Sequence, residues 1–235
     1  MRFKIDFKLL GNAPFFFPVN YQSEFSTWIH KMLHFQNPEF SKWLADKKYI
    51  EESTAEYRLY TFSDVEFQGH KVQDDRMVVE GDDATMTISF YAPLEIEPFI
   101  ISIFENQEFK IGDSRGKVPI KIQNIELIGE PNFKADGLTA FSSLSPILIP
   151  DGNNHGTFMA PDHKDFEKAF FKSLMFKYAN LVKFIPAGIG QELSGLNDLR
   201  FQLVGKPKPK IVKVKTDTPH QKAVKGFMFD FKMKA

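Results

Sequence analysis

The hydrophobic period of the sequence changes from two to about 3.6 within its first 35 residues. In residues 2–10 apolar side chains alternate with charged ones, which predicts a β-strand with one buried face: Phe3, Ile5, Phe7 and Leu9. From Ser23 the apolar residues recur three and four positions apart, which predicts an amphipathic helix: Phe25, Trp28, Ile29, Met32 and Leu33. Each element must bury its apolar side against another layer, so the start of the chain favours an α+β fold.

The rest of the chain continues this mixture of strands and helices. Aromatic and β-branched residues predict strands at 55–67, 85–93, 118–131, 138–150, 199–205, 210–216 and 225–234. Helical periodicity predicts a short helix at 38–44, behind an Asn-Pro-Glu start signal, and a long one at 165–184. We interpret residues 11–20, with Gly, Asn and two prolines, as a break. Residues 97–109 fit either a strand or a helix.

Composition narrows the class of protein. Of the 235 residues 43% are hydrophobic and 26 are phenylalanine, which is enough to fill real cores. No run approaches the ~20 apolar residues that span a bilayer, and the N-terminus does not resemble a signal peptide. The chain has no cysteine, which excludes disulfides and cysteine-ligated metals. We therefore expect a globular protein of the cytoplasm.

The net charge of +0 conceals an asymmetry. Residues 206–235 hold nine lysines against Asp217 and Asp230, a net charge of +7, so the remainder carries −7. A basic segment on an acidic body can attract a polyanion locally. It can equally be a solvated sheet edge, and the sequence leaves both interpretations open.

Two histidines, His30 and His34, lie four residues apart on the predicted first helix, opposite its apolar stripe. Three interpretations stay open: zinc chelation, acid–base chemistry and plain exposure. The spacing fits H-E-x-x-H, but Lys31 replaces the glutamate and no third ligand is near, so we expect no metal and no cofactor. Imidazoles titrate near ~6.5 and can exchange protons. Beside Lys31 and Arg58 they would suit RNA cleavage by its own 2′-hydroxyl.

Eight short segments, in order over nearly the whole chain, resemble the Cas-six family, the CRISPR-associated endoribonucleases that cut CRISPR precursor RNA at its repeats. They read “MRFKIDFKL”, “PVNYQSEFSTWIHKML”, “NPEFSKWLADKKY”, “RLYTFS”, “LSPILI”, “FEKAFFKSLMFKYANL”, “KPKPKIVKVK” and “AVKGFMFDFKM”. Each segment is loose by itself, and the ordered set is what carries the resemblance.

The resemblance implies two ferredoxin-like, RRM-like modules in tandem, which we place at residues 1–133 and 134–235. It also makes the start of 97–109 a helix. The implied activity is metal-independent cleavage that leaves a 2′,3′-cyclic phosphate and a 5′-hydroxyl. The expected partner is CRISPR repeat RNA, as precursor and as processed guide, and effector subunits or a second copy of the chain are further candidates. The residues expected to contact RNA are Lys31, Lys206, Lys208, Lys210, Lys213 and Lys215.

The sequence also departs from the family. Some members carry a tyrosine late in the first helix, a histidine in the second and a lysine before the “FTFS”-like strand; these places hold His30, Ala45 and Arg58. His30 is then the leading acid or base, His34 its partner, and Lys31 or Arg58 the phosphate stabiliser. The family's last helix and glycine-rich loop are missing after “FDFKMKA”, so the second module is expected to be incomplete. A non-cleaving RNA binder and a structural effector subunit remain alternatives.

Overall fold

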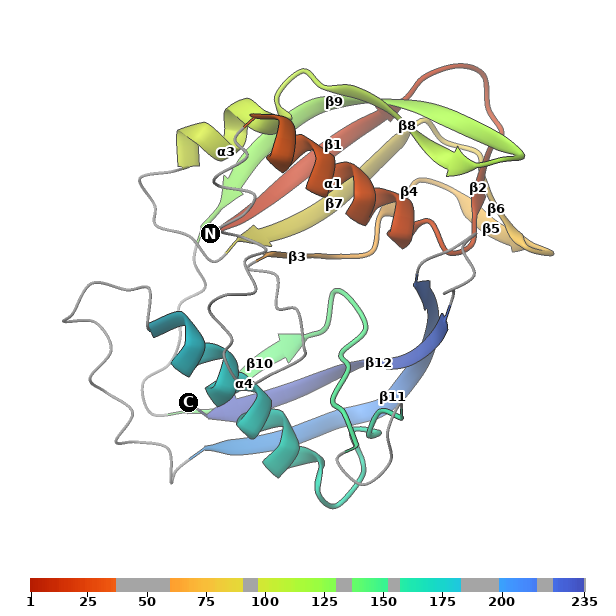
Figure 1. Cartoon of the computed structure of the whole chain (residues 1–235). Helices are drawn as coiled ribbons and strands as arrows, with labels where there is room; N and C mark the ends of the chain where they lie inside the picture. Colours follow the sequence, from red (N-terminus) through yellow and green to blue (C-terminus); the bar gives the residue numbers. More distant parts are fainter. Residues whose placement is uncertain are drawn as a thin grey trace. The chain divides into compact units, whose positions relative to one another are not determined.

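The computed structural model describes residues 1–36, 60–90, 97–129, 137–151, 157–182, 199–214 and 222–234. The chain divides into two compact units (Figure 1). Unit 1 comprises Met1–Asp46, Arg58–Glu130 and Lys213–Lys222, and unit 2 comprises Lys47–Tyr57, Pro131–Val212 and Ala223–Ala235. Each unit has its own hydrophobic core.

Unit 1 is built on an antiparallel sheet with the strand β1 at its centre. In spatial order its strands are β3 (Tyr60–Phe62), β7 (Asp83–Phe90), β1 (Arg2–Leu9), β9 (Gly116–Ile128) and β8 (Glu108–Asp113), and β4 (Glu66–Phe67) also pairs with β7. The alternation predicted for β1 is confirmed, because its four apolar side chains are at most 2% exposed. The opposite face of β1 carries its charged residues.

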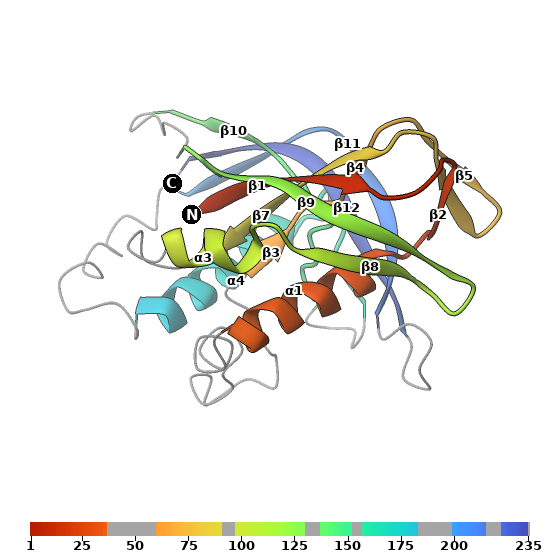
Figure 2. The same cartoon turned by 90° about the horizontal axis from the view of Figure 1, so that it is seen from above.

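Two helices, α1 (Gln22–Gln36) and α3 (Glu97–Phe104), lie on the same side of this sheet (Figure 2). In α1 the side chains of Phe25, Ile29 and Leu33 are at most 1% exposed, as the apolar stripe predicts. The helix that the resemblance implied after residue 97 is confirmed as α3, which buries Ile100, Ile103 and Phe104. The elements β1-α1-β3-β7-α3-β9, with the spatial strand order β9-β1-β7-β3, have the ferredoxin-like topology.

A second, three-stranded sheet in unit 1 contradicts the break expected at residues 11–20. Its order is β2 (Phe15–Pro18), β6 (Arg76–Val79) and β5 (His70–Gln73). Pro14 and Pro18 lie before and at the end of β2 and leave the strand between them intact. Phe15 and Phe17 are at most 6% exposed, so burial of alternate aromatic rings holds β2 in place.

Unit 2 contains the sheet β10 (Thr139–Ser142), β12 (Lys222–Lys234) and β11 (Arg200–Val214), in that spatial order. The helix α4 (Phe166–Val182) covers one face of it (Figures 1 and 2). Phenylalanine rings form the core between helix and sheet: Phe166, Phe170, Phe171, Phe227, Phe229 and Phe231. The Glu167 carboxylate at the start of α4 accepts a 2.9 Å hydrogen bond from the Phe201 amide of β11. The predicted α+β class is thus confirmed.

Details of unit 2 differ from the sequence prediction. The strand expected at 138–150 ends at Ser142 and continues only as isolated bridges, Ile147 with Phe227 and Pro150 with Phe158. In α4, Leu174 has the helical spacing that places it on the side of the buried Phe166 and Phe170, yet it is 38% exposed, while Phe171 is buried. The two strands expected at 199–205 and 210–216 are one strand, β11. Its prolines are tolerated because β11 is the edge of its sheet, where a missing N–H breaks no ladder.

The short helix predicted at 38–44 lies outside the described residues. Of the helices in the described ranges, none combines the length and the apolar character that crossing a bilayer requires.

The packing of α1 can be tested with two matched substitutions in unit 1. Phe25→Ala removes a ring that meets Phe7, Tyr21 and Trp28 at centroid distances of 5.8–6.1 Å, so we expect a loss of about 3–5 kcal/mol in unfolding free energy. Phe16→Ala removes a ring that is 51% exposed and should cost about 1 kcal/mol or less. Urea unfolding of both variants measures the difference. Equal losses would contradict the assigned orientation of α1.

Candidate functional site

The exposed face of α1 carries the predicted histidine pair. Because Trp28, Ile29 and Leu33 turn into the core, the opposite side of the helix, with His30, Lys31 and His34, is exposed. Glu24 lies in the first turn of α1 and His34 in its last turn. The helix therefore presents two imidazoles and one ammonium group to solvent on a rigid support.

The two imidazole rings lie side by side. Their centroids are 6.3 Å apart and their planes differ by 12°. This near-parallel arrangement follows from the i, i+4 spacing, which places both side chains one above the other on the helix. Both rings can thus reach one ligand of the size of a phosphodiester.

Of the predicted RNA-contacting lysines of β11, Lys206, Lys208 and Lys210 belong to unit 2 and Lys213 to unit 1. Lys206, Lys208 and Lys213 are exposed, and Lys210 is half-buried. Lys206, Lys208 and Lys210 occupy alternate positions, which puts successive side chains about 6.5–7 Å apart on an extended strand. That spacing is comparable to the distance between phosphates in an extended nucleic-acid strand.

Two further predicted residues, Arg58 and Lys215, lie outside the described residues, and so does Ala45. The structure places His30, Lys31 and His34 together on successive turns of α1 and the four described lysines together on β11. In the described ranges, no group of three or more His, Cys, Asp or Glu residues has the arrangement of a metal site.

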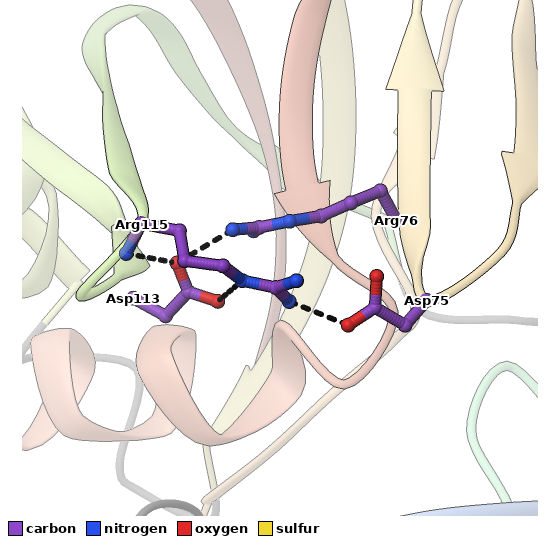
Figure 3. A network of polar contacts seen from close by, with 4 residues as sticks. All are labelled: Asp75, Arg76, Asp113 and Arg115. Atoms are coloured by element: carbon purple, nitrogen blue, oxygen red, sulfur yellow. Dashed lines mark hydrogen bonds and ion pairs between the residues drawn. The ribbon is translucent and has the colours of Figure 1, made fainter.

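A polar cluster that the sequence analysis did not single out joins two hairpins of unit 1 (Figure 3). We call it the hairpin clasp: Asp75, Arg76, Asp113 and Arg115. The Arg76 Nη2 donates to Asp113 Oδ1 at 2.8 Å, and the Arg115 Nη2 donates to Asp75 Oδ2 at 2.6 Å. Asp113 also accepts a 2.9 Å hydrogen bond from the Arg115 amide and lies 3.5 Å from its Nε.

The clasp is partly buried at its centre. The side chains of Arg76 and Asp113 are 15% and 13% exposed, whereas Arg115 and Asp75 are more than half exposed. Burial raises the pKa of Asp113, but the hydrogen bond from Arg76 and the amide of Arg115 outweigh it and hold this pKa below its usual range. The ionised carboxylate is therefore the form that the fold favours.

The sequence signal for this clasp is weak but present. “DDRM” at 74–77 and “GDSRG” at 112–116 each combine turn residues with an acid and an arginine. Gly112 has φ +153°, and a Cβ there would collide with the Gly116 carbonyl, so the second turn requires glycine at this position. Neither segment reveals that the two turns meet, because the pairing spans 37 residues between Arg76 and Asp113.

Comparisons with known proteins bear on these features. Residues 128–235 match the family model of the CRISPR associated protein Cas6, C-terminal. The product of a Cas6-related gene from Pyrococcus furiosus superposes with a TM-score of 0.73 at 22% identity, covering 99% of this chain and 86% of that one. A CRISPR associated protein Cas6 superposes with a TM-score of 0.66 at 17% identity, covering 100% and 87%. No curated protein matches the sequence. At these identities the superpositions show a shared fold.

The charge of the clasp can be tested by exchanging a carboxylate for its amide. Asp113→Asn keeps the shape and removes the charge that two arginines share, so we expect a loss of about 1.5–3 kcal/mol in unfolding free energy at pH 7. The pKa of Asp113 is lower in the folded chain than in the unfolded one. The ionised carboxylate therefore stabilises the fold at pH values above the unfolded-state pKa of ~3.9, and this stabilisation is lost as pH falls further. The unfolding free energies of wild type and variant should thus converge in urea unfolding as pH falls below that unfolded value.

The control is Glu80→Gln, which removes the same charge from the Lys71–Glu80 pair, whose side chains are 62% and 63% exposed. Solvent screens such a pair, so little change is expected at either pH. A loss at Glu80 as large as that at Asp113 would show that general surface charge, and not the clasp, sets the stability of unit 1.

Proposed function

We propose that the chain, whose residues 128–235 match the Cas6 C-terminal family model, is a Cas6-family CRISPR-associated protein that binds CRISPR repeat RNA and cuts it without a metal. The observation that carries the proposal is the pair of parallel, exposed imidazoles of His30 and His34 beside Lys31 on α1. The products would be a 2′,3′-cyclic phosphate and a 5′-hydroxyl. No cofactor takes part in this chemistry.

The proposed reaction needs two proton transfers and one positive charge. One imidazole, as general base, takes the proton of the 2′-hydroxyl while the 2′-oxygen attacks the adjacent phosphorus. The 5′-oxygen leaves and receives a proton from an imidazolium. Lys31 and Arg58 are the proposed cations that stabilise the negative charge gained on the phosphoryl oxygens.

The geometry of α1 supports this division of roles. Proton-transfer partners lie within roughly 2.6–3.2 Å of each other. The ring centroids of His30 and His34 are 6.3 Å apart, so each ring can make one such contact with the same phosphodiester. Because α1 is anchored by buried aromatic side chains, the rings are carried on a rigid element, as a catalytic pair requires.

The proposed grip on RNA comes from β11. Lys206, Lys208 and Lys210 at alternate positions of an extended strand can follow a phosphate backbone, and Lys213 and Lys215 are proposed as further contacts. These lysines belong to the segment with a net charge of +7, so long-range attraction favours a polyanion there. Such contacts position the RNA and do not read its sequence.

A second candidate function is RNA binding without cleavage. It is favoured by Ala45, which takes the place of the histidine that some family members carry in their second helix. Such a protein would hold repeat RNA through the same lysines. A structural subunit of an effector complex, which scarcely touches RNA alone, is the third outcome that the experiments below distinguish.

Cleavage tests the role of the histidines directly. Labelled repeat RNA incubated with the protein in EDTA should be cut at one position, and His30→Ala should slow cleavage by at least about 100-fold. His34→Ala should slow it similarly if His34 supplies the second proton transfer. Single-turnover rates at saturating RNA measure the chemical step. Intact RNA with tight binding would support the non-cleaving alternative.

The matched control is Thr27→Ala, which truncates an exposed residue of the same helix whose hydroxyl donates to the Ser23 carbonyl. It should leave the cleavage rate unchanged. Full activity of a His30→Ala/His34→Ala double variant would refute the proposed catalytic pair.

Salt dependence tests the role of β11. Each lysine that neutralises a phosphate contributes about 0.7 to the slope of log affinity against log salt for a single strand. Replacing Lys206, Lys208 and Lys210 by alanine should therefore lower this slope by about two units and weaken binding strongly at low salt. Lys172→Ala, an exposed lysine of α4, is the control. Affinity that is unaffected by the three substitutions or by salt would support the structural-subunit alternative.

A further inference from the structure

A hollow of about 480 Å³ lies on unit 1, next to the hairpin clasp. One part of its wall consists of apolar residues around the start of β2 and the beginning of β9: Leu10, Pro14, Phe15, Phe16, Val118 and Pro119. Asn12 also lines this part. The remaining wall is Arg76, Arg115, Gly116 and Lys117. The hollow is wide open to solvent, so a ligand bound there would keep part of its surface exposed.

An exposed aromatic ring stands at this hollow. Phe16 is 51% exposed, whereas its neighbours on β2, Phe15 and Phe17, are at most 6% exposed. The register pairs Phe16 with Val78, which is 5% exposed, so the exposed ring stands beside a buried valine on the same face of the small sheet. A flat ring with a free face suits stacking against a base, because every base has a π-face.

The charged groups that line the hollow all have the same sign. Arg76, Arg115 and Lys117 line it, and no carboxylate does. Asp75 and Asp113 balance the two arginines from outside the lining, and among the described residues Lys117 takes part in no ion pair. One positive charge is therefore left over at the wall of the hollow.

A buried atom of the hairpin clasp is a second feature next to this wall. The Nη1 atom of Arg76 is buried and has no hydrogen-bond acceptor among the described residues. An unsatisfied buried donor is unfavourable, although the charge of Arg76 is paired with that of Asp113. A phosphate bound beside Arg115 and Lys117 would balance the positive charge that Lys117 adds to this wall.

We propose that this hollow binds one nucleotide of single-stranded RNA, with the base stacked on Phe16 and the phosphate held by Lys117 and Arg115. Aromatic stacking combined with cations along a groove is the general way in which proteins hold single strands without reading their sequence. The Asn12 amide at the rim can hydrogen-bond the edge of the base. The inference takes its class of ligand from the proposed function but does not depend on cleavage.

Binding of a short single strand tests the proposal. The probe is a fluorescent eight-nucleotide oligouridylate in which 2′-deoxy sugars prevent cleavage, with anisotropy measured on the full chain. Phe16→Leu should weaken binding by about tenfold, and Phe16→Tyr, which keeps a stacking ring, should bind as wild type does. Lys117→Ala should weaken binding several-fold and lower the salt slope by about 0.7.

The control for Lys117 is Lys71→Ala, an exposed lysine of β5 that pairs with Glu80 and does not line the hollow. It should leave affinity unchanged. Phe16 and Lys117 lie outside the clasp, so their variants should unfold as wild type does. Unchanged affinity of both Phe16→Leu and Lys117→Ala would overturn the proposal, and so would equal losses for Phe16→Leu and Phe16→Tyr.

Two further readouts complete the test. Uridine monophosphate should displace the probe more effectively than inorganic phosphate, and equal displacement would overturn the nucleotide site in favour of a simple anion site. Cleavage of repeat RNA by the unaltered protein in EDTA is measured separately. A protein that binds through Phe16 but never cuts RNA would refute the proposed nuclease and support this site.

Discussion

The structure of unit 1 depends on the packing of α1 against the apolar face of β1. Phe7 of β1 meets Phe25 and Trp28 of α1 in edge-to-face contacts with centroid distances of 5.8 and 6.2 Å. Trp28 also stacks on Phe109 of β8 at 3.9 Å. These contacts fix the rotation of α1 about its own axis, since turning the helix would expose the rings. The same constraint sets which residues of α1 face solvent, and therefore where its two imidazoles point.

Periodicity was sufficient to predict those elements whose burial is decided locally. The alternation in β1 and the stripe in α1 each predict one buried side, and His30 and His34 follow as exposed without further information. Residues 97–104 show the limit of this reasoning. Their β-branched residues allow a strand, yet burial of Ile100, Ile103 and Phe104 against the sheet favours the helix α3. Family resemblance, not local propensity, predicted that outcome.

Features made by long-range pairing were not predictable from single segments. β2 lies between prolines and gains its stability from β6, about sixty residues away in the sequence. The hairpin clasp likewise joins the turn at Asp75 to the turn at Asp113. Each turn alone looks like ordinary turn chemistry, because the acid and the arginine in it suit a solvated loop equally well. Only the sheet register brings Arg76 next to Asp113, and this register is a property of the whole unit.

Buried phenylalanines stabilise the two units of this chain, whereas an exposed phenylalanine indicates a recognition site. With 26 such residues, aromatic burial is the default means of stabilisation, and both units fill their cores with rings. An exposed ring in such a protein is therefore informative. Alternation of buried and exposed positions along β2 explains why the side chain at position 16 is exposed. It does not explain why this side chain is aromatic, because a polar residue there would cost no core packing. A ring at position 16, beside cations that line the same hollow, is best explained by contact with a flat ligand.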